Sequence, residues 1–443
     1  PPVYILTLFL EILHTEILYV NIDSYQSYKE RDMEIPGLIK VRQFFNREHI
    51  EDIEGKVREE ILGSEVRIKP GSYIAIAAGS RGIRNIHRIV KATVEVVKEF
   101  GGRPFIVPAM GSHGGATAEG QKELLESYGI TEEYTGAPIR SSMEVVELPS
   151  NGLENKVYMD KLAYSADGTI VINRIKPHTD FHGDIESGLL KMCVIGLGKH
   201  KQAIEIHRFG TYGLKYLIPP TAKRIIEYGN IILGIGIVEN AYDETMVISA
   251  AKPEDFERED KRLLDIARGN MPRLPVDKLD LLIVDEMGKD ISGAGMDTNI
   301  IGRIYIDGET EPEKPKITRI VVTDLTEKAH GNAIGIGLAD LTTRRLVNKI
   351  DFNATYQNAV TSTFLHRGKI PVIAEDSKTA IEWALMTCGP IDIPNARIIR
   401  IKNTLSLNEL YISRSVLEEI KDRIEIIGDF TDILDEEGEL IKF

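Results

Sequence analysis

The chain has 443 residues, of which 42% are hydrophobic and 28% are charged, and its formal net charge at pH 7 is −14. This length is sufficient for two domains that each bury a core. An acidic chain without a basic face argues against nucleic acid as a partner, because phosphate binding requires clustered lysines and arginines. The only two cysteines, Cys193 and Cys388, lack metal-ligand spacing, which favours a reducing, cytoplasmic compartment.

Residues 1–32 are interpreted as an N-terminal extension. Their apolar run over 3–10 is too short to span a membrane and lacks the basic leader of a signal peptide. Met33 opens a segment that resembles a natural protein start. No later stretch reaches transmembrane length, so no membrane partner is expected.

From residue 72 the sequence alternates between short apolar runs and helical periodicity, which predicts α/β units around a mainly parallel sheet. Strands are expected over 73–78, 104–108, 169–173, 231–238 and 245–250, and helices over 86–97, 118–128 and 253–268. The proline-containing segment 269–275 marks a boundary. Residues 33–272 are therefore assigned to an N-terminal α/β domain.

A second α/β pattern follows and assigns residues 273–443 to a C-terminal α/β domain. Strands are expected over 279–284, 317–323, 370–374 and 396–401, and helices over 341–349, 354–363 and 379–386. The predicted fold class is α/β, with two mainly parallel sheets and an active-site cleft between the domains.

The loops after the predicted strands carry the residues suited to chemistry, and ligands of open parallel sheets bind beyond the carboxyl ends of the strands. Arg81 and Arg84 follow the first strand, and a guanidinium matches a carboxylate or phosphate. His113 lies in a glycine-rich loop after the second strand, and His178 follows the strand at 169–173. Neutral imidazole suits proton transfer near pH 7. An anionic substrate or cofactor is expected.

Lys191 lies in an apolar segment, 185–195, for which a helix is predicted. A lysine there either extends to solvent or, when desolvated, acts as a nucleophile or cofactor anchor. A reversal at 196–198 and a second helix would return His207 toward Lys191. His200 and His207 are two helical turns apart, but no third zinc ligand accompanies them.

Taken in order, these motifs resemble the nickel-dependent lactate racemase family over roughly residues 71–401. The resemblance implies a nickel-pincer mononucleotide cofactor held in a cleft between two α/β domains. It implies that His113 and His178 are the two acid/base histidines, that Lys191 tethers the cofactor, and that His207 ligates nickel. The expected phosphate-seating residues are Gly111, Ser112, Gly114 and Gly115, and the expected substrate-binding residues are Arg81, Arg84 and Lys289.

The implied activity is that of a racemase or epimerase of a 2-hydroxy acid, either lactate-like or a larger sugar acid. Inversion at such a carbon needs one base for each enantiomer and one hydride acceptor. The implied partners are the hydroxy acid and the enzymes that make the cofactor.

Two questions about the site and two other functions stay open. His200 competes with His207 as the metal ligand, and Leu189-Leu190, where the family has glycines, leaves open whether the cofactor is attached covalently. The other functions considered are a lyase or hydrolase with a directly histidine-bound metal, and a non-catalytic anion-binding protein on the same fold.

Overall fold

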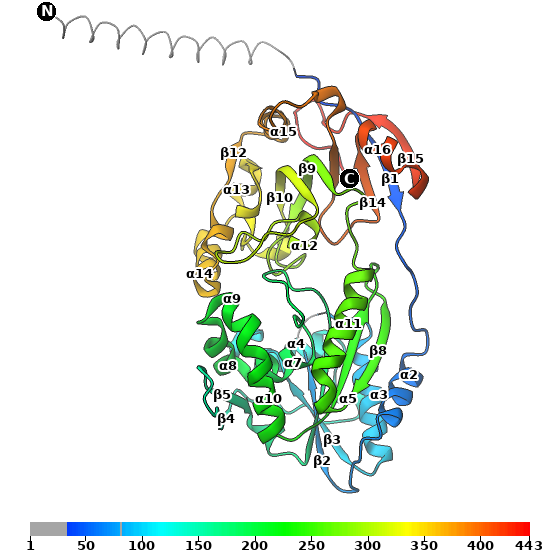
Figure 1. Cartoon of the computed structure of the whole chain (residues 1–443), viewed down its shortest axis with the longest axis vertical. Coiled ribbons are helices and arrows are strands. Elements are labelled where there is room, and N and C mark those ends of the chain that lie inside the picture. The colour runs from blue at the N-terminus through cyan, green and yellow to red at the C-terminus, as the bar shows by residue number, and fades with distance from the viewer. Residues whose placement is uncertain (1–32, 80–81) are drawn as a thin grey trace, which may run out of the picture.

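The computed structural model describes residues 33–79 and 82–443. It consists of two α/β lobes arranged along the long axis, the first domain and the second domain (Figure 1). The predicted α/β class with two mainly parallel sheets is therefore confirmed, and the active-site cleft between the domains stays a prediction. The expected N-terminal extension, residues 1–32, lies outside the described residues, as does Arg81. None of the described helices combines the length and the apolar composition that crossing a membrane would require.

The first domain is built on a five-stranded sheet in the order β3-β2-β6-β7-β8, in which only the β7–β8 pair is antiparallel. Its strands are β2 (Tyr73–Ala78), β3 (Arg103–Pro108), β6 (Gly168–Arg174), β7 (Ile231–Glu239) and β8 (Thr245–Ala251). A separate hairpin is formed by β4 (Val145–Leu148) and β5 (Val157–Asp160). The parallel arrangement brings the loops after β2, β3 and β6 to one edge of the sheet.

Alternate residues of these strands enter two different cores, because successive side chains point to opposite faces of a sheet. Ile74 and Ile76 of β2 pack with α2 and α3, whereas Ala75 and Ala77 pack with the helices that follow β6. The helices are α2 (Ile53–Gly63), α3 (Ile86–Glu99), α4 (Ala118–Ser127), α5 (Glu132–Thr135), α6 (Lys161–Tyr164), α7 (Leu189–Lys191), α8 (Lys199–His207), α9 (Gly210–Tyr212), α10 (Ile218–Tyr228) and α11 (Phe256–Asn270).

The second domain is built on an eight-stranded sheet in the order β12-β11-β10-β9-β13-β14-β1-β15. The strands from β12 to β13 are parallel, and β14, β1 and β15 are antiparallel to their neighbours. The strands are β1 (Leu38–Gln43), β9 (Lys278–Met287), β10 (Lys316–Leu325), β11 (Leu341–Thr343), β12 (Val372–Ala374), β13 (Ile398–Ile401), β14 (Glu409–Ile412) and β15 (Ile424–Thr431).

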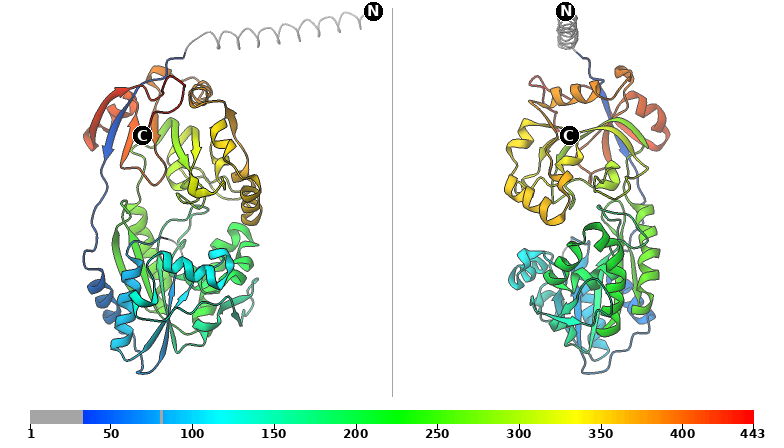
Figure 2. Two further views of the ribbon diagram at one scale, coloured as in Figure 1. Left: turned by 180° about the vertical axis from the view of Figure 1, so that it is seen from behind. Right: turned by 60° about the vertical axis from the view of Figure 1, so that its left-hand side comes forward.

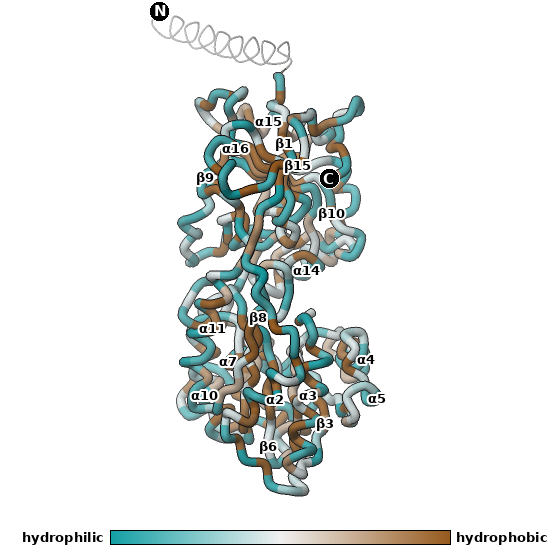
Figure 3. The backbone as a smooth tube through the Cα atoms, turned by 90° about the vertical axis from the view of Figure 1, so that its right-hand side faces the viewer, coloured by the Kyte–Doolittle hydropathy of each residue, from teal (hydrophilic) through white to brown (hydrophobic). Residues whose placement is uncertain are grey.

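Strand β1 departs from the expected division of the chain. It belongs by sequence to the segment 33–272 but pairs with β14 and β15, so it is part of the second domain's sheet. Leu38 and Val41 are completely buried there. The chain then runs along one side of the molecule to α2 and returns after α11, so that it crosses between the domains twice (Figures 1 and 2). Hydrophobic segments gather inside each domain (Figure 3).

The helices of the second domain are α12 (Thr298–Ile301), α13 (Arg344–Asn348), α14 (Phe352–Ser362), α15 (Ser377–Met386) and α16 (Arg414–Ile420). The single helix expected over 341–349 is wrong, since this segment is β11 followed by α13. Thr342 and Thr343 explain the difference, because β-branched residues favour strands and their hydroxyls donate to Val322 O and Thr323 O of β10.

Candidate active site

The loops that carry His113 and His178 leave the same edge of the first sheet. The first follows β3 and the second follows β6, with β2 lying between these strands. The loops start two strands apart in the sheet, so their starting points are separated by about 10 Å. The expected loop after β2 lies between them, but Arg81 within it lies outside the described residues.

His178 is held by contacts on both ring nitrogens and on one ring face. Its Nε2 lies 2.6 Å from Lys191 Nζ, and its Nδ1 lies 3.1 Å from the backbone nitrogen of Asp180, which donates to it. The ring stacks on Phe181 with 4.7 Å between the centroids. Only 13% of the His178 side chain is exposed. Because two nitrogens in hydrogen-bond contact cannot both donate, one member of the His178–Lys191 pair accepts, and a proton can pass between them.

Lys191 ends the short helix α7 (Leu189–Lys191), which continues directly into a π-helix, η2 (Met192–Gly196). The regular helix expected over 185–195 is therefore wrong. Asp260 of α11 caps the start of α7, because its carboxylate accepts hydrogen bonds from the backbone N–H groups of Leu189 and Leu190 at 2.8 and 2.9 Å. Burial raises the pKa of Asp260 to about 7, although these two hydrogen bonds lower it. π-Bulges are frequent at functional sites, and this one follows the candidate cofactor lysine.

Gly188 offers a first test of this arrangement. Its φ of −177° is open to any residue, but an added Cβ would lie 2.4 Å from Asp260 Oδ1. We expect Gly188→Ala to displace the carboxylate and to lower the free energy of unfolding by about 1–3 kcal/mol, the usual cost of overpacking. Urea unfolding measures this. Gly183→Ala is the matched control in the same loop, because its Cβ would approach nothing closer than 3.7 Å. Equal stability of the two variants would contradict the assignment.

A network of buried polar side chains holds the backbone of the His113 loop. Gln121 is completely buried, and its Nε2 donates to the carbonyl oxygens of Gly111 at 2.9 Å and His113 at 3.2 Å. Its Oε1 accepts from Lys199, which forms a fully buried ion pair with Asp160 at 3.0 Å. The backbone of the loop is thereby fixed, while the His113 residue itself is exposed.

The expected phosphate-seating residues have different environments. Gly114 has a φ of +61°, and a Cβ there would lie 2.6 Å from the backbone of Gly120, so this glycine is required by packing. A Cβ at Gly111 would meet Ile195 of η2 at 3.1 Å, which places the loop against the segment that follows Lys191. Ser112 and Gly115 are exposed. Their role toward a phosphate stays a prediction.

His207 ends α8, the second helix of the predicted pair, and is accessible to solvent, while its return toward Lys191 stays a prediction. The surrounding protein lowers its pKa by desolvation, the charge of Lys191 lowers it further, and Asp180 acts in the opposite direction. A pKa lowered from an ordinary imidazole value leaves the ring neutral at pH 7, the form that ligates metals. His200 is exposed near the other end of the same helix.

Arg84 and Lys289 are both exposed. The backbone N–H of Arg84 donates to Glu239 at the end of β7, at 2.6 Å. Lys289 lies in the second domain, in the loop between β9 and α12. The contacts of Arg84 place its backbone toward β7 and away from β3. The substrate-binding role expected of each stays a prediction.

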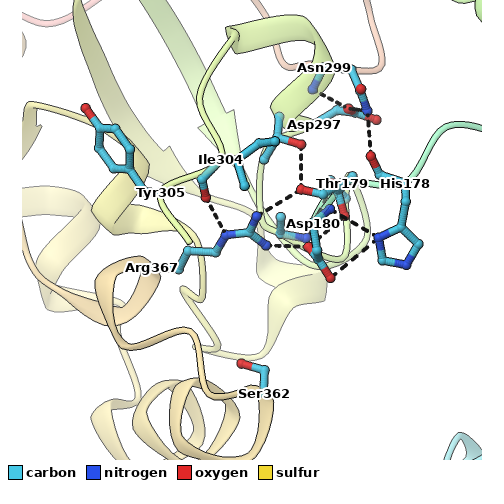
Figure 4. Close-up of polar contacts among 12 residues, drawn as sticks. His178, Thr179, Asp180, Asp297, Asn299, Ile304, Tyr305, Ser362 and Arg367 are labelled. Carbon is cyan, nitrogen blue, oxygen red and sulfur yellow. Dashed lines mark hydrogen bonds and ion pairs between the residues drawn. The ribbon is translucent and has the colours of Figure 1, made fainter. Parts of the chain in front are cut away.

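Four charged residues that the sequence reasoning did not select lie around the His178 loop. Glu186 accepts the backbone N–H groups of His178 and Gly183 and the guanidinium of Arg268. Burial raises the pKa of Glu186, but hydrogen bonds from His182, the two amides and Arg268 outweigh it and lower the pKa. Asp180 and Arg367 form an ion pair beside the ring (Figure 4). Asp180 is two residues from His178, but no local signal points to Arg367.

Among residues 33–79 and 82–443, no group of three or more His, Cys, Asp or Glu side chains could hold a metal ion.

No protein-family model matches the sequence. No curated protein matches it either. Among solved structures, the chain is similar to that of the lactate racemase apoprotein from Thermoanaerobacterium thermosaccharolyticum, with 12% sequence identity and a TM-score of 0.48. The match covers 84% of this chain and 99% of that chain.

Proposed function

We propose that this chain is an isomerase, a racemase or epimerase of a 2-hydroxy acid, that uses a nickel-pincer nucleotide. The observation that carries the proposal is the 2.6 Å contact between His178 Nε2 and Lys191 Nζ. It joins a candidate base to the candidate cofactor lysine, two residues that the family resemblance selects from separate motifs.

The residues present fit such a cofactor. His207 offers one neutral, accessible imidazole, which is what a metal already held in an organic pincer would require of the protein. Lys191 is half-buried and within electrostatic reach of His207, so one cofactor could contact both. When bound, the cofactor supplies the hydride acceptor of the reaction.

The chain supplies the proton chemistry. His178 takes the hydroxyl proton from one enantiomer and returns it to the keto oxygen in the reverse direction, and His113 does the same for the other enantiomer. Support comes from the two loops, which leave the same sheet edge on either side of β2. Where the cofactor is bound non-covalently, the Lys191 amine can accept the proton held on His178 Nε2. Arg81, Arg84 and Lys289 are the candidates for binding the substrate carboxylate.

Co-expression with the enzymes that make the cofactor tests this proposal. The purified protein is expected to carry nickel and to convert either enantiomer of lactate, or of a larger 2-hydroxy acid, into a mixture of both. Chiral chromatography measures the interconversion, and elemental analysis measures the metal. Protein expressed without the cofactor enzymes is the control. A co-expressed protein without nickel that interconverts no 2-hydroxy acid would contradict the proposal.

A further inference from the structure

The loop that carries His178 belongs to the first domain by sequence, but residues of the second domain hold its backbone. Asn299 Nδ2 donates to His178 O at 3.2 Å, and Thr298 Oγ1 donates to Thr179 O at 2.7 Å. Arg367 Nη2 donates to the same Thr179 oxygen at 2.9 Å (Figure 4). Both domains therefore contribute to the position of His178.

Arg367 is anchored firmly on the side of the second domain. It is only 2% exposed, its Nε donates to Ile304 O at 3.0 Å, and its guanidinium lies 5.1 Å from the centroid of the Phe364 ring. The other end of the rigid guanidinium fork reaches across the domain boundary, where Nη1 lies 2.5 Å from Asp180 Oδ1. The planar group thus binds both domains at once, which a lysine could not reproduce.

Asp180 connects Arg367 to the imidazole of His178. Its Oδ1 meets Arg367, while its backbone N–H donates to His178 Nδ1 and its Oδ2 lies 3.7 Å from that nitrogen. Burial would raise the pKa of Asp180, but its electrostatic interactions with the His178 ring and with the Arg367 guanidinium outweigh burial and hold the pKa well below its usual range. The carboxylate is therefore ionised at neutral pH, and it depends on a partner from the other domain.

We propose that Arg367 is a positioning residue. Together with Asp180, Thr298 and Asn299 it forms an interdomain clasp that fixes the His178 ring only while the two domains are in contact. Loss of Arg367 would leave the Asp180 carboxylate poorly compensated, and a buried charge without its partner rearranges toward water. The clasp and its effect on the position of His178 are features of the fold, whereas its effect on turnover rests on the proposed function.

Hydrogen–deuterium exchange of Arg367→Met tests the clasp directly. The amides of His178, Asp180 and Gly183 are hydrogen-bonded within the loop, so their exchange reports its order. Exchange over residues 176–183 is expected to rise by about tenfold or more, with β6 unchanged.

Arg303→Met is the matched control. Arg303 is also buried, pairs with Asp340 at 2.8 Å and donates to Leu338 O, all within the second domain. This variant should leave exchange over 176–183 unchanged. Unaltered exchange in Arg367→Met, or an equal rise in both variants, would overturn the proposal.

Asp180→Asn provides a second variant if Arg367→Met folds poorly, since it removes the charge at nearly constant volume. It should also raise exchange over 176–183, and continued full protection would count against the clasp. In enzyme with the proposed activity, Arg367→Met should lower kcat more than it alters KM, and Arg367→Lys should recover only part of the loss. A loosened loop in a protein without racemase activity would refute the proposed function and leave the clasp standing.

Discussion

Replacing His178 by alanine is expected to lower racemisation by about 10²- to 10⁴-fold, the usual contribution of a positioned acid–base side chain. The loss should be equal in both directions, because two enantiomers have the same free energy and the ratio of their kcat/KM values must remain one. His113→Ala should behave in the same way, since each turnover uses both bases. Chiral chromatography from each pure enantiomer measures both directions.

His178→Gln separates the chemical role from the structural one. Glutamine can still form a hydrogen bond to Lys191, but it cannot take up and return the substrate proton. The activity of His178→Gln should therefore be as low as that of His178→Ala, while its fold is better preserved. His49→Ala, which alters an exposed histidine paired loosely with Glu244, is the control and should retain full activity. Undiminished turnover by His113→Ala or His178→Ala would rule out the two-base mechanism.

The second large effect concerns the cofactor. His207→Ala is expected to lower nickel retention by more than the 10- to 100-fold that loss of an outer-shell partner typically costs. The melting temperature should hardly change, because His207 is accessible to solvent. Elemental analysis of protein co-expressed with the cofactor enzymes gives the nickel content. His200→Ala is the matched control from the same helix, and nickel loss confined to His200→Ala would reassign the ligand.

Lys191 decides how the nucleotide is attached. If the bond is covalent, the co-expressed wild-type protein should show an increased intact mass, and Lys191→Ala should show the unmodified mass. If the site is non-covalent, as the Leu189-Leu190 departure allows, both masses should be unmodified and Lys191→Ala should keep partial activity. An unmodified mass without nickel in the wild type would contradict the cofactor assignment as a whole.

Local patterns explain why most of the elements could be predicted. The alternation of apolar runs with helical periodicity identified β2, β3, β6, β7 and β9, because burial on both faces of a parallel sheet demands continuous hydrophobic strands. Turn residues then placed His113 and His178 after β3 and β6. Since parallel strands end at the same edge, these loops could be predicted to leave one side of the sheet without knowing a single tertiary contact.

Segments whose conformation depends on distant partners were predicted less well. The segment 185–195 has the composition of a helix, but Asp260, about seventy residues later, caps its second half and a π-helix follows. Strand β1 has an ordinary amphipathic pattern that does not reveal its partners, β14 and β15. Strand pairing and helix capping between residues so far apart in the sequence are stabilised only in the folded state. The propensities of a short peptide therefore do not predict them.

By itself, therefore, the sequence determined the α/β class, the order of most strands and helices, and the chemical types of the side chains at the ends of β3 and β6. Only the tertiary structure decided that His178 contacts Lys191 and that Arg367 of the second domain pairs with Asp180. The physical reason is the distance along the sequence over which each interaction acts. Periodicity and turn chemistry act over a few residues, whereas a buried ion pair forms only after both domains have folded and excluded water around it.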